Sequence, residues 1–394
     1  MARNESLPQV SLVEEALREG MQIESADIPV ERKLELLDLL STSGLQNIVV
    51  GSFVSPKWVP QMAQIDDLAE RFEPAEGVTY TALALNARGR ERIAQYAHKF
   101  TAGEPGVGVS RLHLCDVFVQ RNNARTTAQE RESLPAVVAE AKAAGVTEAE
   151  VCVNAAWGSN WTGPATQEQR MEALTTQIEA WEQAGIPVTR VQLGDPMSWN
   201  TPKDVREQIA LIKRTWPQIR RFQLHLHDAR GMAMLSAYEA MYQLDAQDHL
   251  VVDTGLGGMG GCPYCGNGRL TGMIPTEDFV HLLESEGIET GISLDVLIEA
   301  AALATDMVGH DLWGRVSKAG PRPEGDAVYP MDMPFIETFS QAQHFRLGPE
   351  VYAGAPSPWK APITSAQREN YERTVAGRTA VPRGEGHEGH HAGN

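Results

Sequence analysis

The chain has 394 residues, of which 42% are hydrophobic and 22% charged, so it is long enough for one large barrel or two domains of a soluble globular protein. Its 34 Lys and Arg residues against 52 Asp and Glu residues give a net charge of −18, which argues against nucleic acid and anionic membranes as partners. The sequence shows no signal-peptide pattern, no apolar run of membrane-spanning length and four cysteines, so we expect a cytoplasmic protein.

Short apolar segments alternate with longer amphipathic segments over most of the chain. Several of the amphipathic segments are followed by a glycine, as is typical of helix ends: Gly44, Gly145 and Gly185. The predicted strands are Val10–Val13, Gln46–Val50, Thr79–Leu85, Arg111–Asp116, Glu148–Val153, Thr189–Leu193, Phe222–His227 and Leu250–Asp253. The predicted helices are Val30–Ser43, Asn86–Ala97, Glu130–Ala144, Gln167–Ala184, Pro202–Trp216 and Ala233–Leu244.

Eight strands that alternate with helices predict an α/β protein with a parallel sheet, and their number favours a closed (β/α)8 TIM barrel with a C-terminal extension. We expect the barrel at residues 1–315, with its active site at the carboxyl ends of the strands. Residues 316–380 are interrupted by proline but contain many aromatic residues, which favours an ordered strap, with a lid over the site as the alternative. Residues 381–394 are rich in glycine and histidine and are predicted to be disordered.

Two histidines lie near the end of the seventh predicted strand. His225 and His227 are two residues apart, so both side chains point to the same face of that strand. Such a pair is typical of a metal site, but two hydrogen-bonded structural histidines fit the pattern equally well. Other parts of the sequence must decide between the two interpretations.

A loop follows the eighth predicted strand, and almost every second residue in it is glycine. Gly255–Gly260 fits the dinucleotide pattern G-x-G-x-x-G, but further glycines and Pro263 stand where a helix should begin. Cys262 and Cys265 form a C-x-x-C motif, for which redox catalysis is the minor interpretation and a regulatory disulfide an open one.

The turn after the first strand carries Arg18 and Glu19 side by side. A solvated turn would also contain such charges. In a barrel, however, strand one pairs with strand eight, which brings this turn within reach of His225 and His227. Glu19 would then join the two histidines around one metal ion, and the amide oxygen of Asn267 would supply a fourth ligand. This mixed nitrogen and oxygen set suits Mg²⁺ or Mn²⁺, with Zn²⁺ and Co²⁺ as further candidates.

Several segments resemble one known family. The eleven residues Ser52–Met62 resemble a loop of 3-hydroxy-3-methylglutaryl-CoA lyase almost letter for letter. His225–Asp228 and Gly260–Tyr264 resemble the metal strand and the catalytic-cysteine loop of that family, and Pro275–Asp278 and Gly287–Gly291 match its closing helices. The resemblance spans roughly residues 10–320. The sequence is identified as a member of the metal-dependent TIM-barrel lyases and Claisen-type synthases, and its Cys-Pro-Tyr loop points to the lyases.

The resemblance implies a retro-Claisen cleavage of a 3-hydroxyacyl-CoA to acetyl-CoA and a keto acid. It implies that a divalent ion, bound by Glu19, His225, His227 and Asn267, holds the substrate oxygens. It also implies an acyl-CoA as the substrate partner and a homo-oligomer, either a dimer or a tetramer.

The same resemblance implies roles for the remaining polar residues. Arg18 would neutralise the thioester oxygen as the enolate forms, and Cys262 would protonate that enolate. Glu19 and His225 are the candidates for the base that removes the hydroxyl proton. Substrate binding is assigned to Gln22, Arg18 and Asn267.

The sequence departs from the family in the residues around this chemistry. Glu19 stands where the family usually has Asp, and Val49 stands where the lyases have Glu. Trp157, Trp161 and Trp199 make the neighbouring loops bulkier. We interpret these changes as a lyase of the same reaction type that acts on a 3-substituted analogue. The alternatives are a Claisen-type synthase or aldolase that joins acetyl-CoA and a keto acid, and a non-catalytic or thiol-redox protein on the same scaffold.

Overall fold

The computed structural model describes residues 6–355, apart from residues 85, 102–103, 266–271 and 329–335. The main sheet has nine strands: eight parallel strands in the order β3-β2-β1-β10-β9-β8-β5-β4, and the short β11 (Ile274–Pro275), which pairs with β10. Because β1 pairs with both β2 and β10, the first and last strands of the series are neighbours, as in a barrel. The strands are β1 Gln9–Glu14, β2 Asn47–Ser52, β3 Thr79–Leu83, β4 Val107–His113, β5 Glu148–Asn154, β8 Val188–Asp195, β9 Arg221–Leu226 and β10 His249–Gly255.

The predicted α/β barrel is confirmed, with one difference in its hydrogen bonding. Within the described part of the chain, no ladder joins β3 to β4, so the ring of strands is open at that seam. The fourth strand also begins and ends earlier than predicted. Cys115 caps the N-terminus of the next helix through its side chain, which accepts a hydrogen bond from the N–H of Phe118, and this ends the extended segment before Asp116.

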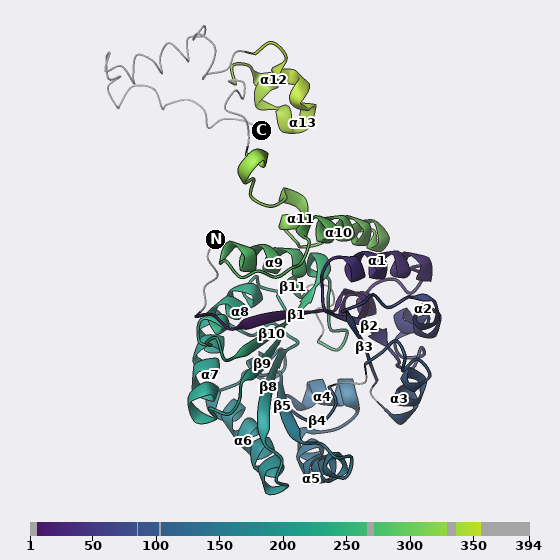
Figure 1. Ribbon diagram of the computed structural model, residues 1–394, viewed down its shortest axis with the longest axis vertical. Helices are drawn as coiled ribbons and strands as arrows, with labels where there is room; N and C mark the ends of the chain where they lie inside the picture. Colours follow the sequence, from purple (N-terminus) through teal and green to yellow (C-terminus); the bar gives the residue numbers. More distant parts are fainter. Residues whose placement is uncertain (1–5, 85, 102–103, 266–271, 329–335, 356–394) are drawn as a thin grey trace, which may run out of the picture. The chain divides into compact units, whose positions relative to one another are not determined.

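Helices follow the strands and cover the outer face of the sheet, as Figure 1 shows. Thr166 and Thr201 cap the helices that follow them, and Gly145 and Gly185 have the positive φ angles expected after a helix end. The helices of the barrel are α1 Val30–Thr42, α2 Ile65–Arg71, α3 Ala87–Ala94, α4 Asp116–Asn123, α5 Thr127–Ala143, α6 Gln167–Gln183, α7 Pro202–Thr215, α8 Ala233–Met241, α9 Thr276–Ser285, α10 Leu294–Val308 and α11 Val316–Ala319.

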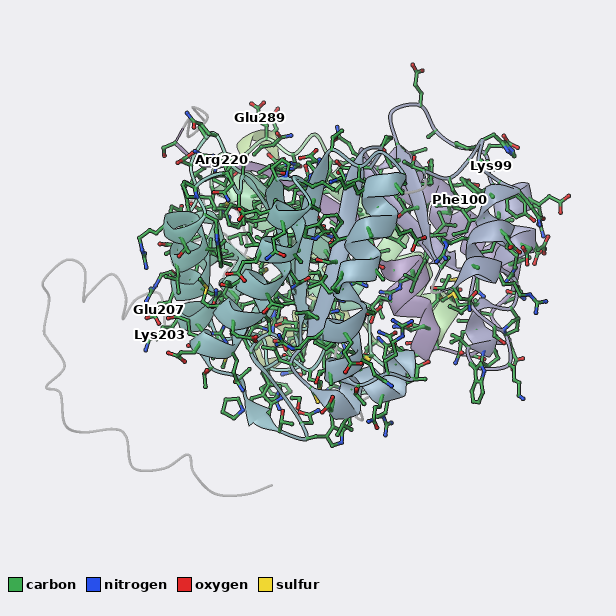
Figure 2. The ribbon with its side chains drawn as sticks, turned by 90° about the horizontal axis from the view of Figure 1, so that it is seen from below. Lys99, Phe100, Lys203, Glu207, Arg220 and Glu289 are labelled. Carbon is green, nitrogen blue, oxygen red and sulfur yellow. The ribbon has the colours of Figure 1, made fainter. Side chains whose placement is uncertain are left out.

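The hydrophobic core lies between the strands and the helices. Helix α7 shows how its sequence produces this arrangement: Val205, Ile209 and Ile212 recur at helical spacing and are fully buried. Lys203 and Glu207, on its other face, form an ion pair of 4.0 Å at the edge of the molecule in Figure 2. Burial of the apolar face therefore holds α7 on the sheet, and the exposed pair adds little.

The interior of the barrel is polar. Arg111 of β4, Cys152 of β5, Gln192 of β8 and Gln223 of β9 are in register on neighbouring strands. The Arg111 Nε donates to the Cys152 sulfur at 3.3 Å, and that thiol lies 2.9 Å from the Gln192 oxygen. Gln223 donates to Asp253 of β10 at 2.8 Å. This row of polar side chains lies directly below the carboxyl ends of the strands.

The chain divides into two compact units, residues 1–321 and residues 322–394. In the second unit, the described elements include α12 (Phe339–Ala342), whose N-terminus is closed by a capping box from Thr338 and Gln341, and α13 (His344–Leu347). The strap or lid at residues 316–380 stays a prediction, and the predicted tail at residues 381–394 lies outside the described residues. Within the described part, none of the helices has the length and apolar character needed to span a bilayer.

Candidate active site

The predicted site residues lie at the carboxyl ends of three neighbouring strands, β1, β9 and β10. After β1 the chain forms a short helix, Ala16–Gly20, which carries Glu19. His225 lies on β9 near its end, and His227 follows that strand directly. The intervening Leu226 is fully buried on the helix side of the sheet, so both histidines face the interior, as predicted.

Glu14, the last residue of β1, fixes the turn that carries Glu19. One of its carboxylate oxygens accepts hydrogen bonds from the backbone N–H groups of Ala16 (2.8 Å) and Leu256 (2.9 Å), and the other accepts one from the Thr276 hydroxyl at 2.5 Å. Burial raises the pKa of Glu14 to about 7, although these hydrogen bonds act in the opposite direction. The carboxylate thus joins the turn after β1 to the segments that follow β10.

Glu19, His225 and His227 form a cluster that fits a divalent cation. One ligand atom from each lies within 4.8 Å of the others, and the Glu19 Oε1 is 3.5 Å from the His227 Nε2. Glu19 and His227 are buried, with 3% and 0% of their surfaces exposed. A buried carboxylate and two convergent imidazoles form a donor set that first-row divalent ions and Mg²⁺ accept. Asn267, the fourth predicted ligand, lies outside the described residues.

Arg18 is the cation that balances this acidic cluster. Its guanidinium forms an ion pair with the Glu19 Oε2 and lies 3.6 Å from the Glu15 Oε2. Burial raises the pKa of Glu19, but the charge of Arg18 and the nearby His227 outweigh it, so the pKa is lowered overall. Glu19 is therefore held ionised, as a metal ligand must be.

Asp253 of β10 orients His225. The Asp253 Oδ2 lies 2.8 Å from the His225 Nδ1, and its Oδ1 accepts the hydrogen bond from Gln223. Burial lowers the pKa of His225, but the hydrogen bond and charge of Asp253 outweigh it and raise the pKa to about 9. With Nδ1 bound to Asp253, Nε2 is the nitrogen left for a metal, which is the usual carboxylate–histidine–metal arrangement.

We expect Asp253→Asn to weaken metal binding about 10- to 100-fold, because His225 then loses the anion that sets its tautomer and orientation. Titration of the metal-free protein with Mn²⁺, followed by electron paramagnetic resonance, measures this affinity directly. Gln223→Ala is the matched control, since it removes the neighbour of Asp253 but leaves the contact with His225. Unchanged Mn²⁺ affinity in the Asp253 variant would contradict the role of this residue.

The cysteine loop is tied to the turn that carries Arg18 and Gln22. Cys262 and Cys265 are buried free thiols, and the N–H of Cys265 donates to the carbonyl of Cys262 at 3.2 Å. A hydrogen bond between the two side chains, together with burial, raises the pKa of Cys265. Gln22 donates to the carbonyl of Gly261 at 3.1 Å, which ties the first turn to this loop. The predicted Arg18, Gln22 and Cys262 are thus brought to one site.

The model of the HMGL-like family matches residues 9–304 of this chain. The chain belongs to the HMGL-like family. A Pseudomonas aeruginosa relative of this family, described as 3-hydroxy-3-isohexenylglutaryl-CoA/hydroxy-methylglutaryl-CoA lyase, is 32% identical over 312 residues, which are 79% of this chain and 96% of that protein. The mitochondrial hydroxymethylglutaryl-CoA lyase of Mus musculus is 29% identical over 311 residues, which are 79% and 89% of the two chains.

Solved structures of HMGL-like relatives have the same fold. A hydroxymethylglutaryl-CoA lyase from Pseudomonas aeruginosa gives a TM-score of 0.64 at 30% identity and covers 79% of this chain and 98% of its own. An HMG-CoA lyase from Acinetobacter baumannii, in complex with coenzyme A and 3-methylmalate, gives a TM-score of 0.65 at 26% identity over 84% of this chain and 99% of its own. The predicted family is therefore confirmed, and these relatives are carbon–carbon lyases by name.

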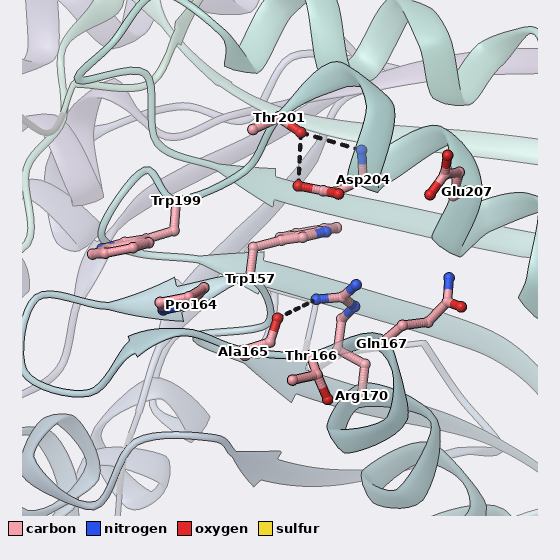
Figure 3. A pocket seen from close by; sticks show the side chains of 10 residues that line it. All are labelled: Trp157, Pro164, Ala165, Thr166, Gln167, Arg170, Trp199, Thr201, Asp204 and Glu207. Atoms are coloured by element: carbon pink, nitrogen blue, oxygen red, sulfur yellow. Dashed lines mark hydrogen bonds between the residues drawn. The ribbon is translucent and has the colours of Figure 1, made fainter.

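Trp157 and Trp199 line a separate pocket of about 440 Å³. Figure 3 shows Trp157 between the first turns of α6 and α7, with Trp199 to one side, near Pro164. The Arg170 guanidinium lies 5.8 Å from the Trp157 ring and donates to the carbonyl of Ala165 at 3.1 Å. The Glu19 cluster does not contribute to the walls of this pocket. These two tryptophans therefore also have a packing role outside the metal cluster.

Proposed function

We propose that this protein is a divalent-metal-dependent lyase that cleaves a carbon–carbon bond of a 3-hydroxyacyl-CoA by a retro-Claisen reaction. The substrate is 3-hydroxy-3-methylglutaryl-CoA or a 3-substituted analogue, and the products are acetyl-CoA and a keto acid. The observation that carries this proposal is the convergence of Glu19, His225 and His227 beside Arg18 at the carboxyl ends of the barrel strands. Membership of the HMGL-like family supports the same proposal.

The metal that we propose for this cluster is Mg²⁺ or Mn²⁺, with Zn²⁺ and Co²⁺ as further candidates. Glu19, His225 and His227 would hold it, with Asn267 as the proposed fourth ligand. When bound, the ion supplies a Lewis acid and a template for the substrate oxygens. Arg18, held beside Glu19, places a positive charge where the thioester oxygen becomes negative. Its side chain is half-buried, with 19% of its surface exposed, which strengthens this effect because less water competes.

Cys262 is the proposed proton donor to the acetyl-CoA enolate. It lies in the buried loop that Gln22 ties to the first turn, and that turn also carries Arg18. Gln22, in that first turn, is a proposed substrate-binding residue.

The experiment that tests the function is acetyl-CoA release from 3-hydroxy-3-methylglutaryl-CoA, with Mg²⁺ or Mn²⁺ and a reductant. We also propose a panel of 3-substituted analogues, because the name of the Pseudomonas aeruginosa relative includes a methyl and an isohexenyl substituent. The highest kcat/KM in the panel identifies the substituent. Condensation of acetyl-CoA with a keto acid, in the absence of cleavage, would instead indicate the Claisen-type synthase. The cytoplasmic location and the dimeric or tetrameric state stay predictions.

Oxidation is expected to inactivate the enzyme through the two neighbouring thiols. Hydrogen peroxide would convert Cys262 and Cys265 to a disulfide with release of two water molecules, which removes the proposed proton donor. Intact-protein mass spectrometry should show a loss of about 2 Da, and dithiothreitol should restore activity. In Cys265→Ala, the control, no such internal disulfide can form. If Cys265→Ala also lost about 2 Da on oxidation and regained activity with dithiothreitol, the pairing of Cys262 with Cys265 would be contradicted.

A further inference from the structure

Glu15 is a carboxylate in the barrel interior that belongs to neither the predicted metal ligands nor the predicted catalytic residues. It directly follows β1, and 7% of its surface is exposed. Its neighbour Glu14 contacts the segments after β10, whereas a Glu15 oxygen lies within 4.8 Å of ligand atoms of His225 and Asp253. Glu15 therefore points toward the site that the metal cluster occupies.

Glu15 has one oxygen that lacks a hydrogen-bond donor in the described part of the chain. Its Oε2 is buried and accepts no hydrogen bond from any residue that the structure describes. The Arg18 Nη1, at 3.6 Å, is too distant for a hydrogen bond and instead donates to Glu19. Asp253, in contrast, has a partner on both oxygens. A buried carboxylate oxygen without a donor is unfavourable, so we expect its donor to come from a bound molecule.

The chemistry of the proposed substrate limits what this donor can be. A carboxylate accepts hydrogen bonds and donates none, so its partner needs an O–H or N–H group. At the reacting end of an ionised 3-hydroxy-3-methylglutaryl-CoA, the thioester and the free carboxylate are acceptors only. The hydroxyl on C3 is the one donor there. This hydroxyl must lose its proton when the C2–C3 bond breaks.

Glu19 and His225, which the family resemblance suggests as the base, both have other partners. Glu19 is paired with Arg18 on one oxygen and is a proposed metal ligand. His225 has its Nδ1 on Asp253, which leaves its Nε2 for the metal. A lone pair that coordinates a cation is not available to take a proton. Among the described carboxylates of this cluster, Glu15 is the one with a buried oxygen that lacks a hydrogen bond.

We propose that Glu15 is a catalytic residue that takes the proton of the C3 hydroxyl, an inference that rests on the proposed function. The O–H bond breaks and the proton goes to the Glu15 Oε2. The electron pair of that bond forms the C3 carbonyl, and the pair of the C2–C3 bond becomes the enolate of the acetyl thioester. The proton that Cys262 gives to this enolate completes acetyl-CoA, so one proton is taken and one is given in each turnover.

The test compares a substrate with an analogue that lacks the hydroxyl. Glu15→Gln should lower kcat for 3-hydroxy-3-methylglutaryl-CoA about 10²- to 10⁴-fold, the range of a lost general base, with KM changed less than about threefold. The inhibition constant of 3-methylglutaryl-CoA, which has no hydroxyl, should change less than about threefold in the same variant. Bound metal, measured by inductively coupled plasma mass spectrometry, should be unchanged. Glu150→Gln is the matched control, because it removes another carboxylate of the barrel interior, on β5.

A purely structural role would give a different result. If Glu15 only held Arg18 in place, the variant would bind 3-methylglutaryl-CoA much more weakly, and this would overturn the assignment. If Glu15→Gln were as active as an active wild-type protein, the assignment of Glu15 as the base would also be overturned. If the wild-type protein itself did not cleave the substrate, the proposed function would be wrong. If Glu15→Gln does not fold, Glu15→Asp tests the same point, because the shorter side chain moves the carboxylate and should lower kcat but not metal content.

Discussion

Replacing Glu19 with alanine is expected to remove the bound metal and to lower kcat/KM for the thioester substrate by roughly a thousandfold or more. Glu19 is the carboxylate of the cluster with His225 and His227, so two imidazoles and no carboxylate of this cluster would remain for the ion. Arg18 would also lose its closest described anion, while Glu15 lies farther away, at 3.6 Å. Metal content after dialysis and acetyl-CoA release together measure the two effects.

Glu19→Asp is the control for this prediction. It retains a carboxylate, and aspartate is the residue that the family usually has here, so metal should stay bound and most activity should remain. Equal metal content and equal rates in Glu19→Ala and the wild type would contradict the metal site. A loss of both in Glu19→Ala, with folding intact by circular dichroism, would agree with it.

Replacing Cys262 with alanine is expected to lower kcat by about 10²- to 10⁴-fold while metal and substrate remain bound. The thiol is the proposed proton donor to the enolate, and alanine of similar size leaves the buried loop in place. The measurement is single-turnover release of acetyl-CoA at a series of protein concentrations, which gives both the rate and the substrate affinity.

Cys265→Ala is the matched control, because it removes the other buried thiol of the same loop. In reductant this variant should keep its rate within a few-fold of the wild type. If Cys262→Ala cleaved the substrate at the wild-type rate, another group would have to protonate the enolate.

Much of the fold could be predicted because its signals are local. The alternation of apolar strands with capped helices depends on residues within one segment, and all eight predicted strands are present. The pair His225 and His227 was also visible, since period two places both side chains on one face of β9. That Glu19 belongs with them required one further step, the pairing of β1 with β10.

The remaining features depend on contacts between strands that no single segment encodes. The contact of Asp253 with His225 crosses from β10 to β9, and the open seam between β3 and β4 is a property of the whole sheet. Glu15 is a similar case. The sequence shows Val49 where the lyases have a glutamate, and Val49 follows Ile48, which pairs with Glu14. Only the register between β1 and β2 shows that a carboxylate, Glu15, lies at nearly the same height as Val49, directly after the end of β1.

The most direct test of the central claim is cleavage of 3-hydroxy-3-methylglutaryl-CoA in D₂O, with the products analysed by mass spectrometry. A metal-dependent retro-Claisen reaction predicts acetyl-CoA and acetoacetate in equal amounts, with one deuterium in the methyl group of acetyl-CoA, because that carbon receives its proton from an exchangeable group such as Cys262. Chelation of the metal should stop the formation of both products. Metal-loaded protein that forms neither product from this substrate or from any 3-substituted analogue would contradict the account.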